Sequence, residues 1–325
     1  MTRTASAFWL NESGNGEVRQ VALPEPGPGE VEVRTLFSGV SRGTETLVFR
    51  GGVPENQYAV MRAPFQEGDF PWPVKYGYLN VGVVEHGDLR GRTVFCLYPH
   101  QTRYVVPETS VTLVPDAVPA SRAVLAGTVE TAVNAVWDAR PLIGDRIAVV
   151  GGGMVGSSIA AVLATFPGAR VELVDADPAR EEVARKLGVG FALPGDALDG
   201  CDLVFHASAT EAGLTTALDL LAPEGRVIEL SWYGDRKISV PLGEFFHSRR
   251  LTIRSSQVGA VGRPDRTYAE RMAVALDLLA DDRFDALVTG HSAFEELPDV
   301  MPKLANGEIP ALCHRIDYGQ GHVPE

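Results

Sequence analysis

The middle of the chain alternates short apolar runs with longer segments of helical periodicity. Short apolar runs between polar residues predict buried strands, and the longer segments predict helices. The expected strands are 147–151, 170–174, 191–193, 202–206, 226–230 and 251–255, and the expected helices are 121–138, 154–166, 178–187, 211–221 and 267–279. Because strands that alternate with helices form a parallel sheet covered on both faces, residues 119–285 are predicted to form a doubly wound α/β domain.

The two ends of the chain are β-rich instead. Strands are expected at 17–23, 30–37, 80–85, 93–97, 102–106, 286–294 and 313–316, and a short helix at 297–305. We therefore expect residues 1–118 to form a β-rich domain that residues 286–325 rejoin. The long segment 51–78 is rich in proline and aromatic residues, which is typical of a functional loop. Its aromatic side chains would either line a substrate pocket or close the mouth of the domain.

Three glycines, Gly151, Gly153 and Gly156, follow the first strand of the central domain directly. In the pattern G-x-G-x-x-G the first glycine permits a tight turn, the second lets the backbone approach a pyrophosphate, and the third lets helix and strand pack closely. The helix that begins here offers unpaired N–H groups to the phosphates. This order predicts a dinucleotide site that includes Met154 and Val155, and a glycine-rich turn in an ordinary α/β fold is the alternative.

An acidic residue closes the second strand of this domain. Asp175 lies 24 residues after Gly151, near the distance expected for a carboxylate that accepts hydrogen bonds from a ribose. A carboxylate there repels the 2′-phosphate of NADP, and Ala176 follows it instead of a basic residue. We therefore predict NAD as the cofactor, with NADP as the alternative because Arg180 is a nearby cation.

Further cofactor contacts are expected where later strands end, because ligands bind at the carboxyl ends of parallel strands. Ser208 follows the fourth strand, and Leu230 and Ser231 follow the fifth. His206 ends the fourth strand, and its side chain is expected to be a satisfied polar group rather than a catalyst.

The chain carries 42 acidic and 29 basic residues, a formal net charge of −13. This charge argues against nucleic acid or an anionic membrane as a partner, because both need a basic face. No apolar run approaches the length of a membrane span, and the first residues lack the features of a signal peptide. The three cysteines, Cys96, Cys201 and Cys313, are too few and too far apart for a disulfide framework. A cytoplasmic location is expected.

Several short segments resemble the medium-chain dehydrogenase/reductase superfamily, the zinc-type alcohol dehydrogenases and their relatives. The resemblance rests on the glycine turn and on the segments 23–30, 38–45, 77–84 and 114–116. It implies a GroES-like β-barrel catalytic domain together with a Rossmann domain, a small-molecule substrate, and a homodimer through the edge strand near 251–258. The segment from Ser38 to Glu45 is similar to a divergent branch that includes bacteriochlorophyllide-type dehydrogenases.

The sequence departs from this family at the zinc ligands. The places of the family's cysteine, histidine and third ligand fall on Ser41 or Arg42, on Tyr78 and on Ala126. Zinc needs cysteine, histidine or carboxylate at each position, and three cysteines cannot form the family's four-cysteine structural lobe. We therefore expect no catalytic and no structural zinc. The alternative is a rearranged metal site built from Glu45, His100 or Glu130.

Without zinc, another group must stabilise the oxyanion that develops as hydride moves. Our hypothesis is that Tyr78 donates or accepts the proton, with Lys75 or Arg42 lowering its pKa. The alternative role of Tyr78 is an aromatic wall of the pocket. Four residues where a strand ends are expected either to contact substrate or nicotinamide or to cap a helix: Ser41, Arg42, Thr44 and Glu45.

Two residues of the helix at 121–138, Glu130 and Thr131, fall where the family's linking helix passes the nicotinamide. Cys96 is expected to be a small buried residue. The remaining histidines have no paired acid identifiable in the sequence and are expected at the surface: His86, His100, His247, His291, His314 and His322.

Together these features predict a zinc-independent oxidoreductase. It would use NAD(P)(H) to move hydride to or from a carbonyl, alcohol or enone carbon of a small substrate, and the aromatic loop favours an aromatic one. The alternatives are an NADPH-dependent enone or quinone reductase, and a non-catalytic dinucleotide-binding sensor or scaffold.

Overall fold

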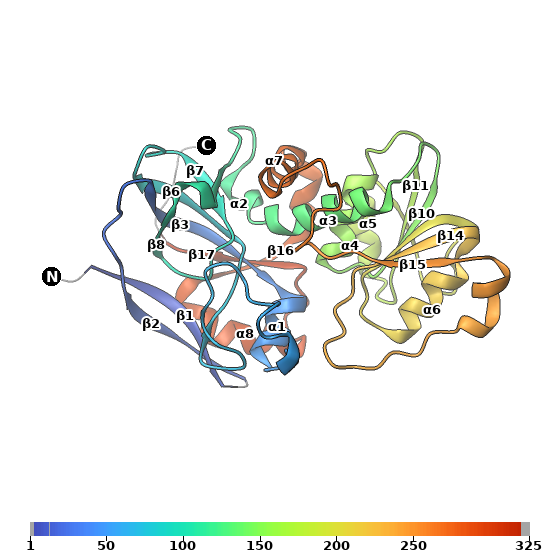
Figure 1. The fold of residues 1–325 in the computed structure, drawn as a ribbon, viewed down its shortest axis with the longest axis horizontal. Helices are drawn as coiled ribbons and strands as arrows, with labels where there is room; N and C mark the ends of the chain where they lie inside the picture. The colour runs from blue at the N-terminus through green and yellow to red at the C-terminus, as the bar shows by residue number, and fades with distance from the viewer. Residues whose placement is uncertain (1–2, 13, 320–325) are drawn as a thin grey trace. The chain divides into compact units, whose positions relative to one another are not determined.

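The computed structural model describes residues 3–12 and 14–319. The chain divides into two compact units, which we describe separately: unit 1 is Met1–Gly127 with Val288–Glu325, and unit 2 is Thr128–Leu287 (Figure 1). The boundaries predicted from the sequence, after residues 118 and 285, lie a few residues before those of the structure. The first difference arises because the helix predicted at 121–138 is two helices, α2 (Ala120–Ala123) and α3 (Ala126–Ala139), and α2 belongs to unit 1.

Unit 1 contains two sheets. The larger runs in the order β16 (Val288–Ala293), β17 (Cys313–Asp317), β3 (Glu30–Ser41), β6 (Asn80–His86), β7 (Thr93–Cys96) and β9 (Val111–Leu113), with β8 (Arg103–Pro107) also paired to β3. The smaller runs in the order β2 (Asn15–Ala22), β1 (Thr4–Glu12), β5 (Val74–Lys75) and β4 (Glu67–Gly68). β17, near the end of the chain, pairs antiparallel with β3, near its beginning (Figure 1). The last segment of the chain is therefore built into unit 1.

Alternating side chains of the larger sheet form a core of unit 1. Its members are Val31, Val33, Val84, Val94, Cys96, Tyr98, Tyr104 and Val106. The rings of Tyr98 and Tyr104 stack with their centroids 3.8 Å apart. The burial is uneven, since β3 is buried along most of its length and β9 has no buried residue. The short helices of this unit, besides α2, are α1 (Arg42–Phe49), η1 (Glu55–Gln57), η2 (Glu108–Ser110), η5 (Phe294–Glu296) and α8 (Leu297–Asn306).

The aromatic residues of the long segment 51–78 pack against one another. The ring centroids of Tyr58 and Phe70 lie 5.6 Å apart, those of Phe70 and Tyr76 5.7 Å, and those of Tyr76 and Tyr78 6.1 Å. Phe70 and Tyr76 are buried. This packing favours the interpretation in which the aromatic side chains of the segment close unit 1.

Unit 2 is built on one parallel sheet of six strands. Its order is β12 (Gly190–Ala192), β11 (Arg170–Val174), β10 (Arg146–Val150), β13 (Cys201–His206), β14 (Leu221–Glu229) and β15 (Thr252–Ser255). Counted along the chain, this is the order 3-2-1-4-5-6 found in dinucleotide-binding sheets. The strand order reverses between β10 and β13, and sheets of this kind bind ligands at the carboxyl ends of the two strands where the order reverses. The other elements of the unit, besides α3, are α4 (Met154–Leu163), α5 (Arg180–Leu187), α6 (Glu211–Asp219), η3 (Leu242–Phe246), α7 (Tyr268–Leu278) and η4 (Asp282–Leu287).

Two features bear on the partners of the chain. β15 is the outermost strand of its sheet, and within the described residues it pairs only with β14. The homodimer expected through this edge stays a prediction. Of the helices in the described part of the chain, none is both long and apolar enough to cross a membrane.

A buried arginine joins two helices of unit 2. Arg271 of α7 is 1% exposed, and its Nε donates to Glu130 Oε1 of α3 at 3.1 Å. Its Nη1 donates to Asn134 Oδ1 at 2.5 Å and its Nη2 to the carbonyl oxygen of Val258 at 2.7 Å. Burial raises the pKa of Glu130, and the guanidinium of Arg271 offsets part of this rise. The position of α7 on α3 therefore depends on this pair.

Replacing Arg271 with leucine is expected to lower the free energy of unfolding by about 3–5 kcal/mol, because the Glu130 carboxylate is then buried without its partner. Urea denaturation followed by circular dichroism measures the change. Arg266→Leu is the matched control, since it removes an exposed arginine that is bonded to Glu270 just outside the same helix, and it should stay close to wild type. Equal, small losses for both variants would contradict this account.

Candidate functional site

The glycine turn of unit 2 has the geometry that its sequence predicts. Gly151 has φ +108°, and a Cβ added there would lie 2.6 Å from the backbone nitrogen of Ser208. A Cβ added at Gly156 would lie 1.9 Å from the carbonyl oxygen of Gly151. Both positions therefore exclude any side chain. At Gly153 an added Cβ would meet no described atom within 4 Å, so this face of the turn is open to a ligand.

The helix α4 begins immediately at this open face. Its N-cap is Gly153, which has no side chain to bond the first N–H groups of the helix. Met154, buried, and Val155, half-buried, form the first turn. The orphan N–H groups of a helix N-terminus and its dipole attract phosphate. The turn thus fits the pyrophosphate of a dinucleotide.

Asp175 holds the glycine turn against the end of β11. Its Oδ2 accepts a hydrogen bond from the N–H of Gly152 at 2.6 Å, and its Oδ1 accepts one from the N–H of Asp177 at 2.8 Å. Ala176 is exposed next to it. Arg180 lies against the same turn, but its Nε is 3.4 Å from Asp177 Oδ2, so its charge already has a partner. A carboxylate fixed here is suited to bond a ribose.

The strand ends contribute a second row of polar groups to the same edge of the sheet. Ser208 follows β13 and lies beside Gly151. Ser231 follows Leu230 at the end of β14; its N–H donates to Glu229 Oε1 at 2.7 Å, and its Oγ accepts from the N–H of Ala209 at 3.1 Å. Thr131 lies on another element, the helix α3, where its side chain is half-buried. The cofactor role of each of these residues stays a prediction.

His206, at the end of β13, is a satisfied polar group, as expected from the sequence. Its Nδ1 lies 2.7 Å from Glu229 Oε2, and its Nε2 lies 2.7 Å from Ser208 Oγ. The hydroxyl of Tyr233 also donates to Glu229 Oε2, at 3.2 Å. The sequence carries no local signal that Glu229 is the partner of His206, because the two residues meet only when β13 and β14 pair in register.

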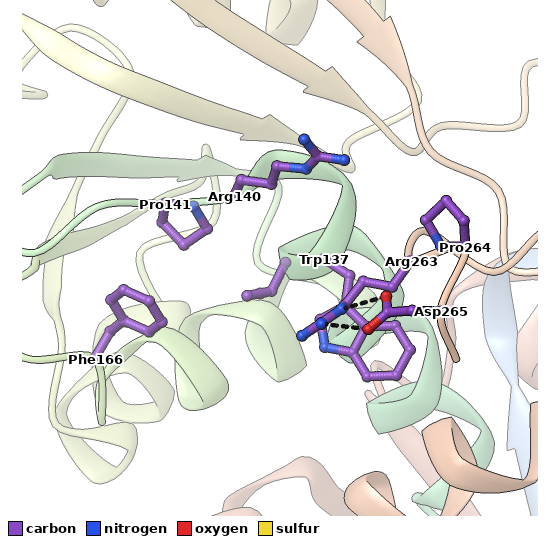
Figure 2. Close-up of a pocket in the computed structure, with 8 residues that line it drawn as sticks. Trp137, Arg140, Pro141, Phe166, Arg263, Pro264 and Asp265 are labelled. Carbon is purple, nitrogen blue, oxygen red and sulfur yellow. Dashed lines mark hydrogen bonds and ion pairs between the residues drawn. The ribbon is translucent and has the colours of Figure 1, made fainter. Parts of the chain in front are cut away.

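A hollow of about 420 Å³ lies elsewhere on unit 2 (Figure 2). It is lined by Val136, Trp137, Arg140, Pro141, Phe166, Arg263, Pro264 and Asp265. Arg140 and Pro141 precede β10 and Phe166 precedes β11, so the hollow lies at the amino ends of these strands. Figure 2 shows Arg263 paired with Asp265 beside Trp137. The hollow is therefore separate from the carboxyl edge that carries the glycine turn.

The candidate catalytic residues of unit 1 meet where β3 ends and α1 begins. The side chains of Ser41 and Thr44 lie close enough to the Tyr78 hydroxyl to lower its pKa. Ser41 is the N-cap of α1, but its side chain does not cap the helix. The N–H of Ser41 instead donates to Glu45 Oε1 at 2.7 Å. Arg42 is half-buried in the first turn of the same helix. This segment therefore combines local hydrogen bonds around Glu45 with a group of neighbouring hydroxyls from Ser41, Thr44 and Tyr78.

Glu45 is also paired with a buried histidine. His100 Nε2 lies 2.9 Å from Glu45 Oε2, and the two side chains are 2% and 4% exposed. His100 Nδ1 lies 2.7 Å from Ser38 Oγ, which lies 2.9 Å from the hydroxyl of Tyr318. The surface position expected for His100 is therefore wrong. No sequence signal linked it to Glu45, because 55 residues separate them and the pairing of strands brings them together.

His314 is the second histidine that was expected at the surface and is buried. It lies on β17, and its Nε2 is 2.9 Å from Ser292 Oγ of the neighbouring β16. Burial and the charge of His291 lower the pKa of His314. A neutral, hydrogen-bonded imidazole in a sheet explains this position without a role in catalysis.

The pKa of Tyr78 shifts in the direction opposite to the one predicted. Burial, with the charge of Glu45 adding to its effect, raises the pKa of Tyr78 to about 12, and the side chains of Ser41 and Thr44 act against the rise. Neither Lys75 nor Arg42 is among the groups that act most strongly on it. The predicted lowering is therefore wrong, and Tyr78 is a neutral phenol over the ordinary pH range.

Lys75 has other partners in unit 1. Its Nζ donates to Glu67 Oε1 at 2.5 Å and to Gln101 Oε1 at 2.6 Å, and it lies 5.2 Å from the ring centroid of Tyr98. Burial lowers the pKa of Lys75, and the hydrogen bond to Glu67 acts against this. The expected role of Lys75 beside Tyr78 is not supported, because the Lys75 ammonium bonds Glu67 and Gln101 and is not among the groups that act most strongly on Tyr78.

The donor groups at the family's metal positions do not fit zinc. Ser41 and Tyr78 supply hydroxyls, and Ala126 supplies a methyl group. The three residues of the alternative metal site do not come together. Glu45 and His100 bond each other in unit 1, and Glu130 bonds Arg271 in unit 2. Among residues 3–12 and 14–319 no three His, Cys, Asp or Glu side chains lie where they could hold one metal ion. The cavity beside Glu45 and His100 is about 10 Å³, no larger than a single water needs.

Comparisons with known proteins agree with this fold. A family model described as "3-hydroxyacyl-CoA dehydrogenase, NAD binding domain" matches residues 146–189, which hold the glycine turn. D-guloside 3-dehydrogenase of Shigella flexneri is 25% identical over 309 residues, 85% of this chain and 86% of that protein. D-xylulose reductase A of Aspergillus oryzae is 24% identical over 233 residues, 66% of this chain and 62% of that protein.

Solved structures are similar over nearly the whole chain. The 2R,3R-butanediol dehydrogenase of Bacillus subtilis has a TM-score of 0.77 at 15% identity, covering 97% of this chain and 100% of its own. L-idonate 5-dehydrogenase of Escherichia coli has a TM-score of 0.79 at 15% identity, and the match covers 98% of this chain and 99% of its own. Acetophenone reductase of Geotrichum candidum, in complex with NAD, has 0.77 at 18%, covering 98% of each chain. The predicted fold class, a GroES-like unit and a Rossmann unit, is confirmed, and the chain has the fold of the medium-chain dehydrogenase/reductase superfamily that its sequence resembles.

Proposed function

We propose that this protein is an NAD(H)-dependent oxidoreductase that works without zinc and moves hydride to or from a carbonyl or alcohol carbon of a small substrate. The observation that carries the proposal is the open face at Gly153, between two glycine positions that exclude any side chain and beside a fixed carboxylate. The similarity to alcohol and sugar dehydrogenases supports the coarser part, an NAD(P)-dependent oxidoreductase.

The residues of unit 2 would hold the cofactor. The N–H groups at the start of α4 would bind the pyrophosphate, and Asp175 would accept hydrogen bonds from the adenosine ribose. Bound nicotinamide supplies or accepts the hydride. NAD is favoured over NADP because a 2′-phosphate would meet the Asp175 carboxylate, while the guanidinium of Arg180 is already paired with Asp177. An enone reductase that uses NADPH remains the second candidate, and tighter binding of NADPH than of NADH would favour it.

Tyr78 would stabilise the developing oxyanion in place of a metal ion, and it would supply the proton. Its raised pKa keeps the hydroxyl protonated, so it can donate a hydrogen bond to the oxyanion that forms when a carbonyl is reduced. The hydroxyls of Ser41 and Thr44 would orient it. Because the charge of Glu45 contributes to the raised pKa, Glu45 would help to keep Tyr78 in this donor form. A non-catalytic sensor or scaffold would bind the dinucleotide but show no turnover with any carbonyl or enone.

Replacing Gly153 with alanine should weaken NADH binding without destabilising the fold. The added methyl group has room in the protein alone, but it would occupy the place of the pyrophosphate. We expect a loss of about 1–3 kcal/mol, roughly a five- to 150-fold rise in the dissociation constant, measured by the fluorescence of NADH. Gly195→Ala is the matched control, since an added Cβ there also meets nothing within 4 Å. Unchanged binding by Gly153→Ala would remove the glycine turn from the cofactor site.

Tyr78→Phe should lower the turnover of carbonyl reduction by at least about 100-fold, because it removes the proton donor. The measurement is the oxidation of NADH with a panel of aldehydes, ketones and keto sugars. Tyr76→Phe, which removes the hydroxyl of the neighbouring buried ring, should stay close to wild type. Wild-type turnover should not fall between about pH 6 and 9 through loss of the Tyr78 proton, since the pKa is raised. Full activity of Tyr78→Phe would assign the tyrosine to the pocket wall.

Purified protein should contain less than about 0.1 zinc per chain, because hydroxyl and methyl groups stand at the family's ligand positions. Elemental analysis by mass spectrometry gives the metal content. Dialysis against a chelator should leave NADH-dependent turnover unchanged. About one zinc per chain, together with loss of activity on chelation, would overturn the metal-free mechanism.

A further inference from the structure

A row of hydrogen-bonded side chains lies at the carboxyl edge of unit 2 and takes no part in the proposed hydride transfer. It runs from Glu229 Oε2 to His206 Nδ1 at 2.7 Å, and from His206 Nε2 to Ser208 Oγ at 2.7 Å. It continues from Ser208 Oγ to Thr210 Oγ1 at 2.9 Å. His206 is fully buried, Ser208 is half-buried and Thr210 is exposed. These hydrogen bonds thus connect a half-buried carboxylate, through a buried imidazole, to the surface.

The backbone around this row of hydrogen bonds leaves room for it and holds its hydroxyl groups in place. A Cβ added at Gly213, on the first turn of α6, would lie 2.1 Å from Ser208 Oγ and 2.9 Å from His206 Nε2. Thr210 is the N-cap of α6, and its Oγ1 accepts from the N–H of Gly213 at 3.0 Å. Ala209, between the two hydroxyl residues, has φ +53°, a conformation that costs free energy in a non-glycine residue. The loop is therefore held in one particular arrangement.

The order serine, histidine, acid is also that of a hydrolytic triad. Two contacts argue against that function. The N–H of Ala209 donates to Ser231 Oγ at 3.1 Å, and the N–H of Thr210 donates to Ser208 Oγ at 3.3 Å. These are the backbone donors that follow the serine, and both are already engaged inside the loop. The histidine is therefore better placed to orient hydroxyls than to activate a nucleophile.

The direction of the hydrogen bonds depends on the charge of His206. In the neutral form Nδ1–H donates to Glu229, so Nε2 must accept, and Ser208 donates inward to it. Thr210 can then donate to Ser208. In the protonated form Nε2–H donates to Ser208, so Ser208 donates to Thr210 and the hydroxyl hydrogen of Thr210 points outward. One proton on His206 thus reverses the whole row of hydroxyls.

This row of hydroxyls lies next to the glycine turn that is proposed to bind the cofactor. Ser208 lies beside Gly151, and the two residues follow the strands β13 and β10, between which the order of the sheet reverses. The phosphates of a dinucleotide offer only hydrogen-bond acceptors, and the hydroxyls of its ribose can both donate and accept. An outward hydroxyl donor at this edge would therefore gain a hydrogen bond that an inward one does not make.

We propose that His206, oriented by Glu229, is a positioning residue for the dinucleotide: its protonation turns the hydroxyl of Ser208 toward Thr210, and so the hydroxyl of Thr210 outward, toward an acceptor oxygen of the bound cofactor. The inference rests on the proposed function, in which unit 2 binds NAD(H). The titratable and charged groups around His206 are Glu229 on β14, Tyr233 and Arg236 in the loop after β14, and Glu211 at the start of α6. Glu229 is the carboxylate in direct contact with the imidazole.

The test is the pH dependence of NADH binding to the full chain, measured by fluorescence at about pH 5.5 and about pH 8.5, on either side of the ordinary pKa of histidine. Wild-type protein should bind NADH about three- to tenfold more tightly at the lower pH, the factor typical of one hydrogen bond. His206→Gln, which cannot titrate, should show no such difference. Ser208→Ala should also lose it. His247→Gln, at an exposed histidine of the same unit, should keep the wild-type difference.

Gly213→Ala keeps the test decisive if His206→Gln does not fold. Its methyl group would displace Ser208 from His206, so it should abolish the pH dependence while leaving the histidine in place. The inference is overturned if NADH binds but His206→Gln or Gly213→Ala keeps the wild-type difference, or if wild-type binding does not change with pH. Wild-type protein that binds no NADH at either pH would overturn the proposed function itself and this inference with it.

Discussion

The contact between Gly156 and the carbonyl oxygen of Gly151 is the constraint on which unit 2 depends. Because no side chain separates them, the helix α4 can start within a few residues of the end of β10. That start places unpaired N–H groups at the carboxyl edge of the sheet. The order of the strands then brings Asp175, from β11, and Ser208, from β13, to the same edge. A polar site is thus created by the way helix and strand pack.

Each unit also contains a row of three hydrogen-bonded side chains: a glutamate, a buried histidine and a serine. In unit 1 the row is Glu45, His100 and Ser38, and in unit 2 it is Glu229, His206 and Ser208. A charged group is costly to bury unless hydrogen bonds satisfy it. Both rows meet that requirement, and both reach candidate functional residues, Tyr78 through the charge of Glu45 and the glycine turn through Ser208. Polar networks of this kind fix one arrangement of side chains.

The sequence predicted the parts of this molecule that depend on local pattern. The apolar runs before Gly151 and Asp175 became β10 and β11, because burial on both faces of a parallel sheet requires continuous apolar residues. The partners of His100 and His206 could not be predicted, because their glutamates lie on other elements and meet them only after the sheets form. The role predicted for Lys75 failed for a related reason: its partners, Glu67 and Gln101, lie on other segments and could not be predicted from its proximity to Tyr78 in sequence.

In the proposed cofactor site, Asp175 would tie the choice of cofactor to the shape of the neighbouring loop. Its two oxygens accept hydrogen bonds from the backbone of Gly152 and of Asp177, so the residue that would reject a 2′-phosphate also fastens the neighbouring chain. An engineer who replaces it with a neutral or basic residue to admit NADP would release two backbone donors at once. Retargeting this enzyme scaffold therefore calls for rebuilding residues 175–180 as a block, with new acceptors for both N–H groups.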